Sequence, residues 1–436
     1  MCRGKECSDA NLNTVCETTS TINGDAGRQD YFGQQDFLRE GDDLASSLKN
    51  ISRTAGVALV MAICATSARA EPFAHPGALH TQADLQRMKE KVGENAQPWL
   101  DSWNILLKNP HASLNWKPRP FAVVYRGKDG KNPENYSALF NDAAAAYALA
   151  LRWKISGDDA YADKAVAILD AWSATLTGIG GSSDKFLASG IYGYQLANAA
   201  EILRTYKKWP ESSFNRFKTM MLDVFYPMNH DFLVRHNGAK IDHYWANWDL
   251  ANMDSMIAIG ILADRPDIYR EAVEYFKHGQ GNGAIDHLVW KIYPDGLGQT
   301  QESGRDQGHN TLNVSLLGAF CQMAWNQHDD LFGYEDNRVL KGIEYIAKYN
   351  LGFDVPYTRY TNSDVTQENI SAAGRGDPRP AWELFYNHYA VLKKLDAPYT
   401  SQFAAKLRPE GGGGNYGPNS GGFDQLGYGT LTYTLR

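Results

Sequence analysis

The chain has 436 residues, of which 43% are apolar, 12% aromatic and 21% charged. This apolar fraction is close to the average of globular proteins and excludes a disordered tail, a collagen or a coiled coil. The formal charge is −7, from 43 basic and 50 acidic residues. Because no net basic field is available, nucleic-acid binding is not expected. A smaller acidic substrate, bound in a local positive cleft, stays open.

The first seventy residues are expected to lie outside the folded domain. Residues 1–50 are polar and aperiodic, and we interpret them as an upstream extension that is not native to the protein. Residues 51–70 contain a basic residue, an eleven-residue apolar run (55–65) and an A-x-A cleavage motif that ends at Ala70, which together are typical of a signal peptide. Eleven residues are too few to span a bilayer, which needs about 20. We therefore predict a secreted or periplasmic protein with a single mature domain over 71–436; the alternative for the apolar run is a short buried helix.

The cysteines agree with this division of the chain. Four of the five lie in the first seventy residues, and only Cys321 remains in the mature part. One cysteine forms no internal disulfide, and Cys321 lies in the apolar run LLGAFCQMAW. We expect it to be buried and unreactive.

Most of the mature chain is predicted to be helical. Thr81 is expected to cap a helix over 83–92, and Pro98 is expected to open a second helix around Trp99 and Trp103. Further helices are predicted at 141–155, 158–176, 191–206, 212–233, 245–262, 267–278, 311–325, 337–349 and 380–395. The best strand signal lies at 427–435, and no repeat of fixed period is present. Because so many helices can pair antiparallel and close into a ring, the predicted fold is all-α, an (α/α) toroid with a central cleft.

The first stretch that can carry chemistry is HYWANWD, from His243 to Asp249, at the entrance of an apolar helix. Polar side chains are costly there unless they are hydrogen-bonded. The amide of Asn247 can bind a carboxylate as a neutral donor, and Trp245 and Trp248 can stack on sugar rings. The alternatives are a capping or buried asparagine and tryptophans that only pack between helices.

The second stretch is QESGRDQGHN, residues 301–310. Arg305 and His309 are four residues apart, so on a helix they share a face. Arginine offers a fork of donors to a carboxylate, and histidine exchanges a proton near neutrality. A solvated loop is the alternative.

The third stretch combines VPYTRYTN (355–362) with GRGDPRPAWE (374–383). Tyr360 is a candidate acid and Arg379 a candidate carboxylate binder, although purely structural roles are equally open for both. The chain has no HExxH, paired-cysteine, Walker, dinucleotide-binding or GxSxG motif, and neither a metal nor another cofactor is expected.

At these stretches the chain resembles the alginate-lyase-type domain of polysaccharide lyase family thirty-eight, over about residues 75–395. The resemblance is carried by HPGALHT, NDAAAAYALALRW, YWANWDLANM, GQTQESGRDQGHNTLN, YNLGFDVPYTRY and RGDPRPAWELFYNHY. It implies an (α/α) toroid and a β-linked polyuronate substrate, either alginate or glucuronan. Lyases of this broader type use an Asn/His/Arg/Tyr set without a metal. Where related lyases place a tyrosine two turns after the arginine, this chain has Leu312.

The resemblance implies one role for each candidate residue. β-Elimination removes the C5 proton of a uronate and expels the 4-O-glycosidic oxygen, and donors at the carboxylate stabilise the charge that develops. These donors would be Asn247 and Arg305, with His309 as the base and Tyr360 as the acid that protonates the leaving oxygen. The alternative is that Tyr360 serves as both base and acid, where the proton and the leaving group lie on the same face. The residues that position the substrate are predicted to be His243, Trp245, Trp248 and Arg379.

The predicted function is therefore a secreted polyuronate lyase, with alginate as the first substrate and glucuronan as the second. One rival is an inverting glycoside hydrolase that depends on Asp249 or Glu302, and another is a non-catalytic polyuronate-binding protein of the periplasm. The expected partner is an anionic polysaccharide, with no nucleic acid and, after removal of the signal peptide, no membrane. The sequence does not indicate the oligomeric state.

Overall fold

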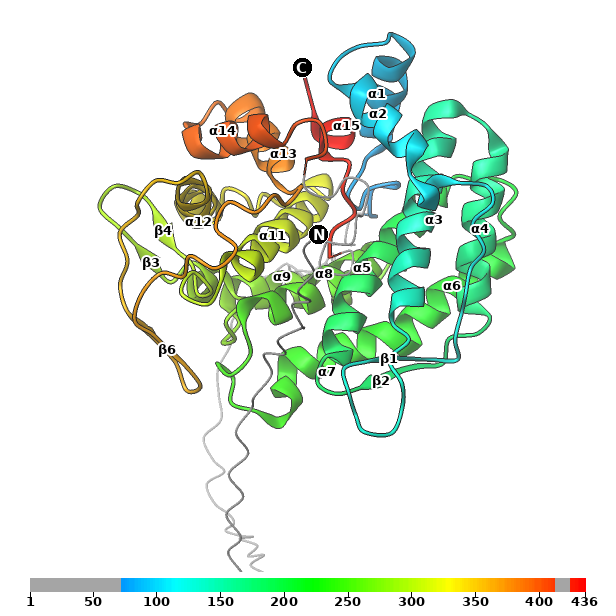
Figure 1. The fold of residues 1–436 in the computed structure, drawn as a ribbon. Helices are drawn as coiled ribbons and strands as arrows, with labels where there is room; N and C mark the ends of the chain where they lie inside the picture. The colour runs from blue at the N-terminus through cyan, green and yellow to red at the C-terminus, as the bar shows by residue number, and fades with distance from the viewer. Residues whose placement is uncertain (1–71, 412–423) are drawn as a thin grey trace, which may run out of the picture. The chain divides into compact units, whose positions relative to one another are not determined.

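The computed structural model describes residues 72–411 and 424–436 of the chain. The predicted upstream extension, signal peptide and cleavage site, with four of the five cysteines, lie outside the described residues. Within these residues most elements are helices (Figure 1), which confirms the all-α prediction. None of the described helices is long and apolar enough to cross a membrane.

The first half of the fold begins at a capped helix, as the sequence predicts. The side chain of Thr81 accepts a hydrogen bond from the backbone of Asp84, and the carboxylate of Asp84 accepts one from the backbone of Thr81, which is a capping box. The helical elements are α1 (Gln82–Gly93), α2 (Trp99–Lys108), η1 (Pro110–Ala112), α3 (Ser137–Ser156), α4 (Asp159–Ser173), α5 (Lys185–Leu203), α6 (Glu211–Met220), η2 (Met221–Phe225), α7 (Tyr226–Arg235) and η3 (His236–Gly238). The predicted helix at 212–233 is thus interrupted by η2, a π-helical turn.

The second half continues the helical pattern with shorter elements toward the C-terminus. Its helical elements are α8 (Ala246–Leu262), α9 (Pro266–His278), α10 (Ile285–Leu288), α11 (Gln307–Asn326), α12 (Tyr334–Asn350), α13 (Trp382–Phe385), the π-helical η4 (Tyr386–Leu392), α14 (Pro398–Leu407) and α15 (Gly429–Tyr433). The strands form three pairs, which are β1 (Val123–Arg126) parallel to β2 (Gly178–Gly181), β3 (Lys291–Ile292) antiparallel to β4 (Gly298–Gln299) and β5 (Tyr360–Thr361) antiparallel to β6 (Thr366–Gln367).

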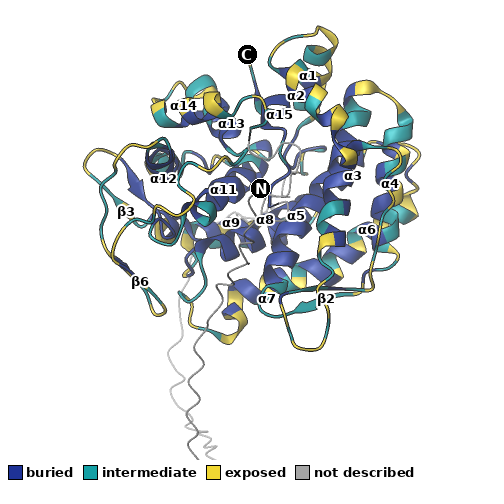
Figure 2. Cartoon of the chain, viewed as in Figure 1, coloured by how far each residue is buried: buried dark blue, intermediate teal, exposed yellow. Residues whose placement is uncertain are grey.

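Helices α5 and α8 form the centre of the domain. Every residue of α8 is buried, and so is every residue of α5 after Lys185 (Figure 2). A helix that is apolar on all sides needs neighbours on all sides, and α5 packs against α3 and α8, while α8 also packs against α7, α9 and α11. Gly190 permits the close approach of the two central helices, because a Cβ there would lie 2.6 Å from the carbonyl carbon of Ala251.

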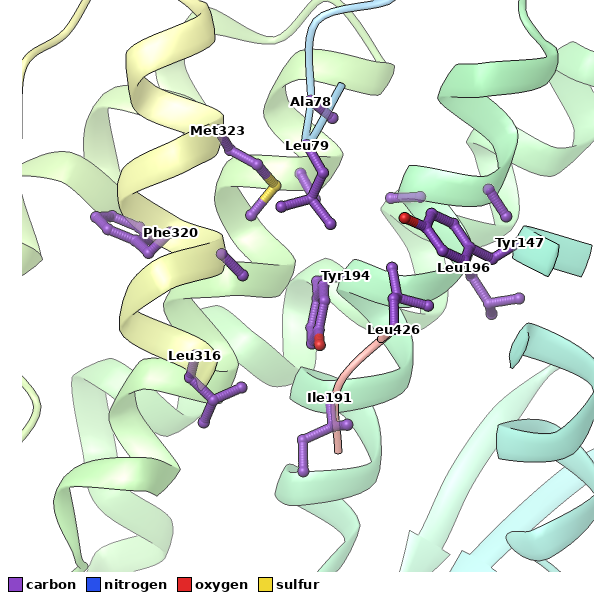
Figure 3. Packing of buried hydrophobic residues seen from close by; sticks show 14 of the residues in the cluster. Ala78, Leu79, Tyr147, Ile191, Tyr194, Leu196, Leu316, Phe320, Met323 and Leu426 are labelled. Carbon is purple, nitrogen blue, oxygen red and sulfur yellow. The ribbon is translucent and has the colours of Figure 1, made fainter. Parts of the chain in front are cut away.

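The C-terminal segment forms a short helix that packs against α1, α2 and α13 and is not a strand. The predicted strand at 427–435 is wrong, because Gly429–Tyr433 forms the short helix α15. Threonines and tyrosines favour strands only where a neighbouring strand offers partners, and here the backbone of Thr432 bonds to Tyr428 and that of Leu435 to the side chain of Asn387. Figure 3 shows Leu426 of this segment beside Tyr194 and Leu196 of α5.

Cys321 lies in the interior of α11, with no exposed surface. Burial raises the pKa of its thiol well above the ordinary value, so the reactive thiolate is disfavoured. The prediction of a buried cysteine is confirmed.

Candidate active site

A cavity of about 370 Å³ collects most of the predicted site residues. Its lining includes Asn247 and Trp248 from the start of α8, Arg305 and His309 at the start of α11, and Arg379 from the loop before α13. Polar residues at the first turns of two neighbouring helices therefore face one space. This arrangement explains why two apolar helices begin in polar stretches.

Asn247 is held in place by the buried carboxylate of Glu302. One oxygen of Glu302 accepts hydrogen bonds from the backbone nitrogen of Asn247 at 3.0 Å, from its side-chain amide at 2.7 Å and from the amide of Asn313 at 3.0 Å. The backbone bond satisfies one of the free N–H groups at the start of α8. Asn247 is thus a fixed amide at the cavity wall, and Glu302 is the group that fixes it.

Arg305 is surrounded on several sides by groups that hold its guanidinium. Nη1 donates to the second oxygen of Glu302 at 2.8 Å, and Nη2 lies 3.1 Å from Nε2 of His309. The guanidinium carbon lies 4.5 Å from the ring centroid of Trp245, a cation–π contact. Trp245 does not line the cavity, so in this structure it stacks on Arg305.

The contacts of His309 fix its tautomer. Nδ1 lies 2.7 Å from the carboxylate of Asp306, and an ionised carboxylate can only accept, so Nδ1 carries the proton. Arg305 can only donate, so Nε2 is the acceptor. The imidazole is therefore neutral, with the lone pair of Nε2 toward Arg305. Its side chain is 44% exposed.

Asp306 has two functions at the start of α11. Its other oxygen accepts the backbone N–H of His309 at 2.8 Å, which makes it the N-cap of the helix. Burial acts to raise the pKa of Asp306, but the side-chain and backbone hydrogen bonds of His309 and the charge of Arg305 outweigh it and lower the pKa. Asp306 thus stays ionised and orients the imidazole.

Besides Trp245, two further predicted residues lie outside the cavity lining. His243 is half exposed and forms an ion pair with Asp364 at 3.2 Å. Tyr360 is buried, its hydroxyl donates to Oδ1 of Asn282 at 3.2 Å, and its ring packs on Trp290. Burial is the main cause that raises the pKa of Tyr360 above its ordinary value, with smaller contributions from charges that include Glu302.

Arg379 joins the cavity to the C-terminal segment. Nη1 donates to Oε1 of Gln425 at 2.8 Å and lies 3.4 Å from Asp424, and Nη2 donates to the backbone oxygen of Gly308 at 3.2 Å. Burial raises the pKa of Asp424 despite the charges of Arg379 and Arg126. Most donors of Arg379 are therefore already occupied within the protein.

Sequence reasoning did not identify three charged residues of this cavity, namely Arg126, Asp184 and Asp424. Arg126 ends β1, and Asp184 immediately precedes α5. No motif marks them, and only the packing of distant segments brings them beside α8 and α11. Asp306, within the predicted stretch, also lines the cavity.

The two carboxylates on which a hydrolase would depend are buried and accept hydrogen bonds from other groups of the protein. Asp249 has no exposed surface and accepts hydrogen bonds from His236 at 3.0 Å and from the backbone of Gly283 at 2.8 Å. Glu302 is equally buried and accepts from Asn247 and Arg305. Neither residue lines the cavity. Among residues 72–411 and 424–436, no group of three or more His, Cys, Asp or Glu side chains is placed to hold a metal ion.

The fold is that of solved alginate lyases. An alginate lyase from Bacteroides ovatus has a TM-score of 0.54 at 15% identity, covering 83% of this chain and 100% of that one. Alginate lyase A1-III from Sphingomonas species A1 has a TM-score of 0.50 at 13% identity, covering 84% and 98%. A histidine-to-alanine variant of A1-III complexed with tetrasaccharide gives 0.55 at 14%, covering 84% and 97%. At these identities the likeness concerns the fold, and it confirms the predicted (α/α) toroid.

Sequence comparison identifies the family. The family model described as alginate lyase matches residues 86–353, which is more than half of the chain, and the chain belongs to this family. It is accordingly a polysaccharide lyase. No curated protein matches the chain significantly in sequence. The family assignment overturns the two rival interpretations, a glycoside hydrolase and a non-catalytic binding protein.

Proposed function

We propose that this lyase cleaves 1,4-linked polyuronates by β-elimination, with alginate as the first substrate. The main observation behind the proposal is that Asn247, Arg305 and His309 line one cavity. Within it, Arg305 donates a hydrogen bond to the lone pair on Nε2 of His309. A lyase of this kind needs hydrogen-bond donors to the substrate carboxylate, placed beside a base. These three side chains supply both.

In the proposed reaction Arg305 and Asn247 bind the carboxylate of the sugar that loses its C5 proton. Arg305 has five N–H donors, and its contacts to Glu302 and His309 leave donors for the substrate. When the guanidinium turns toward the substrate carboxylate, the lone pair of Nε2 becomes free to take the proton. Each donor at the developing charge contributes about 3–4 kcal/mol to the stabilisation of the transition state.

Tyr360 is the proposed donor of the proton to the leaving oxygen. Burial holds its pKa above the ordinary value, so the phenol is protonated and can act as an acid. Its hydroxyl donates a hydrogen bond to Asn282, and neither residue lines the cavity. Tyr360→Phe tests the role: as the acid it lowers kcat by about 10²-fold or more, whereas a purely structural hydroxyl leaves kcat within about threefold.

The activity is tested with the mature protein from Glu71 on polymannuronate, polyguluronate and glucuronan. β-Elimination creates a conjugated 4,5-ene at the new end, so ultraviolet absorbance rises without addition of water to the products. We expect the rise on the alginate blocks first, with unchanged rates in a chelator because Arg305 and Asn247 supply the hydrogen-bond donors to the substrate carboxylate. New reducing ends without absorbance would contradict elimination.

Glucuronan is the second candidate substrate. It has the same carboxylate at C5, and the resemblance to polysaccharide lyase family thirty-eight favours it. If the rate on glucuronan is at least tenfold above the rates on both alginate blocks, glucuronan replaces alginate as the proposed first substrate. The tetrasaccharide held by the A1-III variant supports an oligosaccharide as the ligand of this cavity.

Export is a further part of the proposal. The apolar run at 55–65 and the motif ending at Ala70 support a signal peptide, and a polymeric substrate is met outside the cytoplasm. Expression of the full chain in a secreting host, followed by N-terminal sequencing, should give Glu71 as the first residue. Retention of the protein in the cytoplasm with residues 51–70 intact would contradict it.

A further inference from the structure

Arg126 presents a third arginine to the cavity, beside Arg305 and Arg379, on an element far in sequence from α8 and α11. It is the last residue of β1, and it lines the same cavity as Arg305 and His309. Nη1 donates to the hydroxyl of Tyr192 at 3.2 Å. The guanidinium carbon lies 5.2 Å from the ring centroid of Tyr136 and 5.7 Å from that of Tyr192.

The backbone of Arg126 is fixed by a glycine of the neighbouring strand. Arg126 pairs with Gly181 in the parallel ladder of β1 and β2. Gly181 has φ +116°, and a Cβ at that position would lie 1.9 Å from the carbonyl oxygen of Arg126. The close approach of these two residues therefore constrains the backbone from which the Arg126 side chain extends.

Arg126 differs from the other arginines of the cavity in its partners. Arg305 forms an ion pair with Glu302, and Arg379 forms one with Asp424. Within the described part of the chain, Arg126 is bonded only to a phenol and stacked near two rings, with no carboxylate in ion-pair contact. Among residues 72–411 and 424–436, most of its five donors therefore have no hydrogen-bond acceptor.

Two acidic residues nevertheless influence this guanidinium at longer range. Asp184 and Asp424 line the cavity as well. Burial acts to lower the pKa of Arg126, and the neighbouring phenols and these two carboxylates raise it. Arg126 is thus a charged guanidinium in a cavity that also holds the proposed catalytic groups.

We propose that Arg126 binds the carboxylate of a second uronate, next to the sugar that loses its C5 proton. This inference rests on the proposed function. A polyuronate carries one carboxylate on every sugar, so a chain that places one at Arg305 brings others close by. A planar fork with free donors fits a carboxylate bidentately, which gives both binding energy and geometric selectivity.

The proposal predicts a requirement for charge on the neighbouring sugar. Arg126→Gln should raise KM on the fully charged polymer by about tenfold to hundredfold, the value of a charge-assisted hydrogen bond, and should leave kcat within about threefold. Arg126→Lys keeps the charge without the fork and should lie between the two. Arg119→Gln is the matched control, because Arg119 is exposed and lies outside the cavity lining.

A chemically modified substrate separates carboxylate binding from a structural role. In a polymer with part of its carboxylates reduced to alcohols, many cleavable uronates have neutral neighbours. The ratio of kcat/KM between wild type and Arg126→Gln should then fall toward one. An equal ratio on both polymers, or an unchanged KM in Arg126→Gln, overturns the proposal. Melting temperatures of all variants show whether each one is folded.

A binding measurement makes the inference independent of turnover. A saturated tetrauronate is titrated calorimetrically into His309→Ala with and without Arg126→Gln. Binding that is weaker by about tenfold or more in the double variant supports the second carboxylate site. This result holds even if wild type produces no unsaturated ends, an outcome that would contradict only the elimination proposal. Equal affinity of the two proteins, or absence of binding to both, overturns the second carboxylate site.

Discussion

Nη2 of Arg305 lies 3.1 Å from Nε2 of His309, so the proposed carboxylate binder donates to the lone pair of the proposed base. This bond occupies the lone pair of the proposed base. In the proposed reaction a substrate carboxylate would compete for the same guanidinium and free that lone pair. Substrate binding and activation of the base would then be coupled through one hydrogen bond.

Glu302 is predicted to be indispensable although it does not touch the substrate. It accepts from Asn247, Asn313 and Arg305, and Glu302→Gln removes the charge and replaces an acceptor with a donor. We expect kcat/KM to fall by about 10²-fold and the free energy of unfolding to fall by about 1–3 kcal/mol. Steady-state kinetics and urea denaturation measure the two effects. The control is Glu368→Gln, at an exposed ion pair with Arg359; a folded Glu302→Gln with wild-type kcat would refute this role.

Asp306→Asn is predicted to separate activity from stability. Asparagine caps helices about as well as aspartate, so the bond to the backbone of His309 and the melting temperature should be preserved. Its amide, however, no longer accepts the Nδ1 proton as an ionised carboxylate does, and the imidazole loses its oriented tautomer. We expect kcat to fall by about 10²-fold or more at a melting temperature within about 2 °C. A fall of both quantities together would assign Asp306 to the fold alone.

Trp245 is predicted to act through Arg305. Because its ring lies 4.5 Å from the guanidinium, Trp245→Leu should release Arg305 and lower kcat by about 2- to 30-fold, as expected from a cation–π energy of about 0.5–2 kcal/mol. The sequence-based role, stacking on a sugar ring, predicts instead a higher KM with kcat unchanged. The separate effects on kcat and KM distinguish the two. Trp248→Leu is the comparison, since Trp248 does line the cavity.

His75 is predicted to make stability depend on pH. It hydrogen-bonds to Glu201 and lies 2.9 Å from Asp264. Burial acts to lower its pKa, but the bonds and charges of these carboxylates outweigh burial and raise the pKa above 6.5. Since the folded state binds the proton more tightly, the stabilisation is complete below pH 6.5 and is lost as the pH rises through the folded pKa. Urea denaturation between pH 6 and 9 should show this loss of stability in wild type and not in His75→Gln. Equal pH dependence in both proteins would exclude His75 as its source.

The sequence predicted the parts of the fold and site that depend on local pattern. Asn247, Arg305 and His309 fall in polar stretches that lead into long apolar helices, and α8 and α11 begin within those stretches, at Ala246 and Gln307. Arg126 could not be predicted, since it reaches the cavity only through the pairing of β1 with β2. The same limit applies to the C-terminal segment, whose strand-like composition is overridden by packing against α1, α2 and α13.

The role of His309 as the base is tested by the initial rate of absorbance increase on polymannuronate, measured for wild type and His309→Ala at equal, saturating substrate. Removal of a general base costs about 10²- to 10⁴-fold in rate, and we expect a loss in this range, with unchanged melting temperature and with tetrauronate affinity within about threefold. A His309→Ala protein that eliminates at a rate within about threefold of wild type would show that His309 is not the base.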